Sequence, residues 1–280
     1  MTEVFSEDLT KLREACNSLL SSQFDSLKIV TPPQVSRAET HGDLYRLLLD
    51  GHVIGVKRRS LNPSYVGREV IVHRLRRLFG MNDYPVLNMK GIKLRSAATK
   101  TNCAPFEGWE SSAANLIYFG RENRRVDFSD LRPADIPDII SFFRQCGEWC
   151  AFNYVIGASD RGFRNYVYDL DNNLVYSIDN EERPINALTG NFPEVDREVP
   201  KFRIIAEKFL PRSEDERQRV RVAFRKGCFD RWPLIRQGLN NASLMTDSQL
   251  STRDAEPDVL YCKFALEQRN PLDIVTRINL

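Results

Sequence analysis

Four polar side chains with metal-binding and proton-accepting chemistry lie between positions 160 and 181. Asp160, Asn165 and Asp179 supply two carboxylates and a carboxamide, and Glu181 adds a third carboxylate. Oxygen donors of this kind suit Mg²⁺, which takes one or two carboxylates and completes its shell with phosphate oxygens and water. A further carboxylate can orient a hydroxyl group and accept its proton. These residue types together point to phosphoryl transfer.

The elements around these residues must bring them together. Residues 166–170 and 174–178 are strand-like, and the Asp-Asn-Asn run 171–173 between them is typical of a turn. The two open ends of a hairpin meet, so Asn165 and Asp179 are expected to lie side by side. Asp160 precedes Asn165 by five residues, in a loop after a long helix. An ordinary polar hairpin is the alternative, but it would not require an Asp-Arg-Gly-x-x-Asn motif before it.

The two motifs resemble those of the phosphoinositide 3/4-kinase-like superfamily. Asp160-Arg161-Gly162-x-x-Asn165 is similar to its catalytic loop, and Ile178-Asp179-Asn180 is similar to its metal-binding segment. Type II phosphoinositide 4-kinases are the most similar in motif, and HipA-like kinases are more distant. The resemblance covers about residues 140–184. It implies that Asp160 is the catalytic base, that Asn165 and Asp179 hold Mg²⁺, and that ATP is the phosphate donor.

The resemblance extends more loosely to the N-terminal third. A kinase needs a strand Lys on the α- and β-phosphates and a helix Glu that holds this Lys. Lys57, at the end of a strand-like run, and Glu69, on the next predicted helix, match these roles. The alternative is a surface Lys beside Arg58 and Arg59 and a solvated Glu. No glycine triplet is present to cover the phosphates.

The chain departs from the family pattern at two places. Gly162 replaces the His that is common there, and Glu181 follows the metal-binding motif as either an added ligand or a solvated charge. Arg161 either pairs with a carboxylate and orients the loop or is a plain surface residue. Tyr166, Tyr168 and Tyr176 are expected to pack the hairpin.

The overall pattern predicts an α+β protein with a two-lobed, protein-kinase-like fold. Residues 1–120 are expected to form an N-terminal nucleotide-binding lobe, with an antiparallel sheet and one main helix at 63–79, and residues 121–280 a mostly helical catalytic lobe that carries the hairpin. Strand-like runs at 44–49 and 53–57 flank the hairpin signal Asp50-Gly51. A helix is expected at 132–157, with Asp135 or Pro137 near its start, and proline breaks are expected to interrupt the helical segments at 190–241.

Charge and composition exclude several classes. The net charge of +2 is too small for a strongly basic nucleic-acid binder. The charge cluster at 121–125 is expected to be a solvated turn rather than a phosphate site. The basic run Arg74, Arg76 and Arg77 is expected to lie on a helix face with His73 rather than to bind nucleic acid. No segment has the length and apolarity of a membrane span. The six Cys residues are scattered, as expected for free, mostly buried thiols in the cytoplasm.

The sequence therefore predicts an ATP- and Mg²⁺-dependent phosphotransferase that acts on a hydroxyl group of a protein or a small soluble molecule. An inositol lipid stays open as the acceptor. One alternative is a pseudokinase-like scaffold that binds nucleotide, or nothing, and acts through a partner. A second is an enzyme that transfers the nucleotidyl part of ATP.

Overall fold

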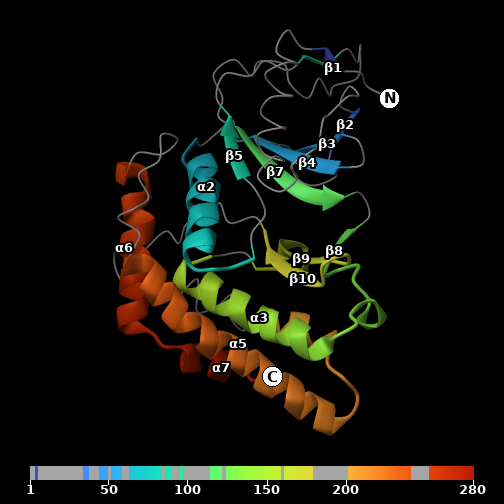
Figure 1. Cartoon of the computed structure of the whole chain (residues 1–280), viewed down its shortest axis with the longest axis vertical. Helices are drawn as coiled ribbons and strands as arrows, with labels where there is room; N and C mark the ends of the chain where they lie inside the picture. Colours follow the sequence, from blue (N-terminus) through green and yellow to red (C-terminus); the bar gives the residue numbers. More distant parts are fainter. Residues whose placement is uncertain are drawn as a thin grey trace. The chain divides into compact units, whose positions relative to one another are not determined.

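A computed structural model gives the fold of the chain (Figure 1). It describes residues 4–5, 34–37, 44–49, 52–58, 63–82, 86–89, 95–96, 114–121, 124–158, 161–178, 201–240 and 252–280. The chain divides into two compact units. The first comprises Met1–Val70 and Tyr84–Arg124, and the second comprises Ile71–Asp83 and Arg125–Leu280.

The first unit contains a five-stranded antiparallel sheet with the strand order β2-β3-β4-β7-β5. Its strands are β2 (Gln34–Arg37), β3 (Leu44–Leu49), β4 (His52–Arg58), β5 (Val86–Met89) and β7 (Ala114–Arg121). Leu49 pairs with His52, so only residues 50 and 51 join β3 to β4, as the Asp-Gly signal predicts. A separate ladder joins β1 (Val4–Phe5) to β6 (Arg95–Ser96).

Helix α2 (Pro63–Leu78) matches the predicted helix at 63–79. It ends in a left-handed cap at Gly80, which has a φ of 63°. The amide of Met81 donates to the carbonyl of Arg76 at 2.9 Å, and that of Gly80 donates to the carbonyl of Arg77 at 3.2 Å. This pair of bonds is the Schellman arrangement, which satisfies the last carbonyls of a helix and requires a residue that tolerates positive φ.

A three-stranded antiparallel sheet in the second unit contains the predicted hairpin, with the order β10-β9-β8. Its strands are β8 (Arg125–Asp127), β9 (Tyr166–Asp169) and β10 (Leu174–Ser177). The expectation of a solvated turn at 121–125 is wrong for Arg125, which begins β8. Its guanidinium lies 4.5 Å from the ring centre of Tyr176 and 3.6 Å from the carboxylate of Asp169. The pairing of Arg125 opposite Asp169 explains why this Arg is drawn out of solvent.

Helix α3 (Ile139–Val155) begins two residues after Pro137, the later of the two residues expected near its start. A short 3₁₀ turn, η2 (Pro133–Asp135), precedes it. The helix starts where the Asp138 carboxylate accepts the amides of Ile140 and Ser141, both at 3.0 Å. Phe143, Cys146, Gly147 and Cys150 form an apolar stripe at helical spacing, and all four are buried. The aromatic core of the second unit gathers around Phe128, whose ring lies within 5.5 Å of those of Phe142, Tyr166 and Phe209.

Helix α5 (Glu214–Asn240) lies alongside α3 (Figure 1). The two backbones approach so closely that a Cβ on Gly147 would lie 2.1 Å from the carbonyl oxygen of Phe224. A Cβ on Gly227 would lie 2.0 Å from the carbonyl oxygen of Arg144. These two glycines therefore permit the crossing. The expected proline break is wrong at Pro233, which lies inside α5. Tertiary packing of the helix on α3 outweighs the loss of one main-chain hydrogen bond.

The second unit ends in α6 (Thr252–Gln268) and α7 (Pro271–Ile278), and residues 201–207 are also helical. Asn270 caps α7 by accepting the amides of Leu272 and Asp273. The described part of the chain thus combines α-helices with antiparallel sheets, an architecture compatible with the predicted α+β class. None of the described helices is long and apolar enough to cross a bilayer.

Candidate active site

The β9–β10 hairpin forms as the sequence predicts. Asp169 pairs with Leu174 and Tyr166 with Ser177, which leaves residues 170–173 as the turn. The carboxylate of Asp169 accepts the amides of Asp171 at 3.0 Å and Asn172 at 3.1 Å. This local bonding fixes the turn and therefore the register of both strands.

The open end of the hairpin brings Asn165 opposite Ile178. Asn165 is the last residue of a 3₁₀ turn, η3 (Phe163–Asn165), and only 9% of its surface is exposed. Its carbonyl accepts the Ile178 amide at 2.9 Å, which continues the ladder one step beyond β10. Asn165 is therefore bonded to the residue that precedes Asp179 in the chain. Asp160, Asp179 and Glu181 themselves lie outside the described residues.

Arg161, the second residue of the Asp-Arg-Gly motif, is buried with 4% of its surface exposed. Its Nη1 donates to the Ile178 carbonyl at 2.8 Å and to the Ser177 hydroxyl at 2.9 Å. The alternative of a plain surface Arg is therefore wrong. These contacts join the residue after Asp160 to the residue before Asp179.

A chain of hydrogen bonds continues from Arg161 into the core. Ser177 Oγ donates to Asn153 Oδ1 at 3.2 Å, and Asn153 Nδ2 donates to the hydroxyl of Tyr166 at 3.1 Å. Burial raises the pKa of Tyr166 well above its ordinary value, so this hydroxyl stays protonated. The network fixes the side-chain orientations beneath the open end of the hairpin.

Three side chains on one face of α3 hold the hairpin. Gln145, Trp149 and Asn153 are spaced four residues apart, so they lie along one face of the helix. Gln145 Oε1 accepts the Val175 amide at 2.9 Å, and Trp149 Nε1 donates to the Val175 carbonyl at 2.6 Å. With the Asn153–Ser177 bond, these contacts attach β10 to α3 along the strand.

Sequence reasoning missed the role of Arg76. The sequence placed this Arg on a basic helix face with His73 but did not predict its burial, and Arg76 has no exposed surface. Its Nη1 donates to the Ser177 carbonyl at 3.3 Å. The signal was available, since Arg76 follows Val72 by four residues and precedes Phe79 by three, on the apolar face of α2.

The predicted ATP-binding residues fall on the expected elements of the first unit. Lys57 lies in β4, opposite Leu44 of β3 and Asn115 of β7. Glu69 lies in the second turn of α2. Their side chains lie outside the part of the chain whose side chains the structure describes, so the proposed contact between them stays a prediction.

Within the described residues, no group of three or more His, Cys, Asp or Glu could hold a metal ion. The expectation of free, buried thiols is confirmed for Cys146, Cys150, Cys228 and Cys262, and burial raises the pKa of the first three.

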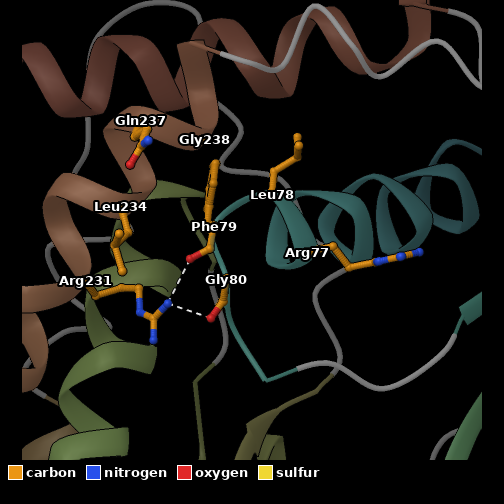
Figure 2. A pocket seen from close by; sticks show the side chains of 8 residues that line it. All are labelled: Arg77, Leu78, Phe79, Gly80, Arg231, Leu234, Gln237 and Gly238. Carbon is orange, nitrogen blue, oxygen red and sulfur yellow. Dashed lines mark hydrogen bonds between the residues drawn. The ribbon is translucent and has the colours of Figure 1, made fainter. Parts of the chain in front are cut away.

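An open pocket of about 320 Å³ lies between the end of α2 and α5, lined by Arg77, Leu78, Phe79, Gly80, Arg231, Leu234, Gln237 and Gly238 (Figure 2). It contains none of the predicted site residues.

No protein-family model and no curated protein matches the chain.

Proposed function

We propose that the chain is an ATP- and Mg²⁺-dependent phosphotransferase of the phosphoinositide 3/4-kinase-like type. The observation that carries this proposal is the joining of three chain segments at the hairpin end. Arg161 and Asn165 both bond to Ile178, through its carbonyl and its amide. Asp160 is joined covalently to Arg161, and Asp179 is joined covalently to Ile178. Because consecutive Cα atoms lie about 3.8 Å apart, each carboxylate residue is one step along the chain from this bonded group.

The donor set at this position fits Mg²⁺. Asn165 and Asp179 offer a carboxamide and a carboxylate, which are hard oxygen ligands, and the Ile178–Asn165 bond lies one residue from the proposed ligand Asp179. The ion would offset negative charge on the ATP phosphates when bound. Lys57 would contact the α- and β-phosphates, and Glu69 would hold the Lys57 ammonium.

The reaction assigns one role to each remaining group. The acceptor hydroxyl oxygen forms a bond to the γ-phosphorus while the bond between that phosphorus and the β–γ bridging oxygen breaks, which releases ADP. Asp160 accepts the hydroxyl proton. The acceptor in this proposal is a protein or a small soluble molecule.

The two units support a kinase-like division of labour. The first has an antiparallel sheet, which contains Lys57, and the first half of α2, which contains Glu69. The second is mostly helical and carries the β9–β10 hairpin. In the proposal these are the nucleotide-binding and catalytic lobes.

The test uses Asp160→Ala and Asp179→Ala, with Asp171→Ala as the matched control in the turn at the other end of the hairpin. ATP and Mg²⁺ binding is measured by calorimetry, and γ-phosphate release or transfer by radiolabelled ATP. Loss of the general base lowers turnover by about 10²–10⁴-fold, and the control keeps the wild-type rate. An Asp179→Ala protein with a normal rate refutes the assignment. Wild-type binding without turnover indicates a nucleotide-binding scaffold, and labelled AMP on a product indicates nucleotidyl transfer.

A further inference from the structure

Two buried arginines converge on the last two carbonyls before Asp179. Arg76, from the end of α2, donates to the Ser177 carbonyl at 3.3 Å. Arg161, from the loop before η3, donates to the Ile178 carbonyl at 2.8 Å. Arg76 and Arg161 have 0% and 4% of their residue surface exposed, respectively. We call Arg76 and Arg161 the arginine pair.

The end of α2, which carries Arg76, is held in place. The last turn of α2 is capped at Gly80, and Arg231 of α5 donates to the carbonyls of Phe79 at 2.8 Å and Gly80 at 2.7 Å (Figure 2). The guanidinium of Arg231 also donates to the carboxylate of Glu148 on α3. The helix end that presents Arg76 is therefore fixed to α5.

The other arginine is held through its partners. Arg161 Nη1 bonds both to Ser177 Oγ and to the Ile178 carbonyl, and Ser177 Oγ bonds in turn to Asn153 of α3. The guanidinium thus fixes two successive residues of the strand end relative to α3. The planar fork of Arg suits such multiple contacts better than the single point charge of Lys.

Burying a guanidinium is costly unless its hydrogen-bonding groups are used. Two buried guanidiniums at one strand end exceed what the hairpin needs, because the turn and α3 already fix β10 through Asp169, Gln145 and Trp149. The added contacts act on Ser177 and Ile178, at the end where the chain continues into the proposed metal ligand.

We propose that Arg76 and Arg161 are positioning residues for Asp179, which hold the end of β10 so that this carboxylate meets Mg²⁺ with Asn165. The inference rests on the proposed function. Loss of a group that orients a metal ligand lowers metal affinity by about 10–100-fold.

The test compares Arg76→Met with Arg77→Met, its exposed neighbour on α2. Two measurements are made on the full chain: Mg²⁺ binding to the ATP-loaded protein by calorimetry, and hydrogen exchange of the Ile178 amide. Arg76→Met weakens Mg²⁺ binding about tenfold and speeds exchange of this amide about tenfold, while metal-free ATP binding changes less than about twofold. Arg77→Met matches wild type in every measurement. Arg76→Lys, which keeps one donor and the charge, falls between wild type and Arg76→Met and serves as the readout if the Met variant does not fold.

The outcomes separate this inference from the proposed function. If the wild-type protein binds neither Mg²⁺ nor ATP, the proposed function and the metal-positioning role are both refuted. The exchange rate of the Ile178 amide then decides whether the arginine pair holds the strand end. Wild-type protein that binds both, with Arg76 variants that match it in Mg²⁺ affinity and in exchange, overturns the arginine pair alone. Equal effects of Arg76→Met and Arg77→Met also overturn it, because the effect would then be one of charge on α2.

Discussion

Replacement of Gly147 by Ala tests the closest packing in the second unit, the crossing of α3 and α5. An added Cβ would lie 2.1 Å from the Phe224 carbonyl oxygen, whereas ordinary contact begins at about 3.4 Å, so the helices must move apart by about 1.3 Å. The obstacle is main chain and cannot rotate away. Gly227→Ala meets the carbonyl oxygen of Arg144 in the same manner, at 2.0 Å.

The size of the effect follows from two opposing contributions. Overpacking of a well-packed core costs about 1–3 kcal/mol, and a gap of about 1 Å between buried side chains forfeits a quarter to a half of their dispersion attraction. Phe224 and Cys228, which are 2% and 0% exposed, lie on this part of α5 and would lose such contacts. Ala gains about 1 kcal/mol over Gly in helix propensity. Because the obstacle is main chain, the cost lies at the upper end of its range, and after subtraction of the propensity gain we expect Gly147→Ala to lower the free energy of unfolding by about 2 kcal/mol.

The assay is chemical denaturation followed by circular dichroism. The control is Gly162→Ala, because a Cβ there meets no atom within 4 Å and the φ of −85° suits any residue. Its stability should stay within about 0.5 kcal/mol of wild type. The double variant of Gly147 and Gly227 should lose less than the sum of the single losses, because one separation of the helices accommodates both methyl groups. A Gly147→Ala protein as stable as wild type, or strictly additive losses, would refute the close crossing.

Three further predictions concern the hairpin and α5. Trp149→Phe removes the indole donor to the Val175 carbonyl and should lower the free energy of unfolding by about 1–2 kcal/mol in denaturant titrations. Burial raises the pKa of Tyr168 from its ordinary value near 10 to about 12, so between these pH values the folded state keeps a proton that the unfolded state has lost. The free energy of unfolding should therefore fall between pH 10 and 12. The fall should be less steep in Tyr168→Phe when unfolding is followed across that range. Pro233→Ala restores an amide donor inside α5 and should raise the melting temperature, with a gain of about 1 kcal/mol or more; a lower melting temperature would contradict the helical geometry there.

Local signals in the sequence were sufficient for the hairpins and the helix ends. Asp50-Gly51 predicts the two-residue connection between β3 and β4, and Gly80 provides the positive φ at which α2 ends. The Asp-Asn-Asn run 171–173 predicts the β9–β10 turn, in which Asn173 has a φ of 55°. These features depend on only a few neighbouring residues.

The features that the sequence did not reveal depend on distant partners. The buried Arg76 donates a hydrogen bond to the Ser177 carbonyl, which lies 101 residues away in the chain. Arg125 becomes part of a strand because β9 lies beside it. Charged residues are usually exposed. Only the folded arrangement supplies the acceptors that offset the desolvation cost of burying them. The roles of Asp160 and Asp179 stay predictions from motif.

The bonding of α3 to β10 has a consequence for assembly. A strand at the border of a sheet normally offers alternating amides and carbonyls that can template a strand from another molecule. In β10 the side chains of Gln145 and Trp149 occupy the amide and carbonyl of Val175, and Arg76 occupies the carbonyl of Ser177. The second unit is thereby protected against edge-to-edge aggregation on this side, and a peptide that added itself as a fourth strand would have to dock on β8.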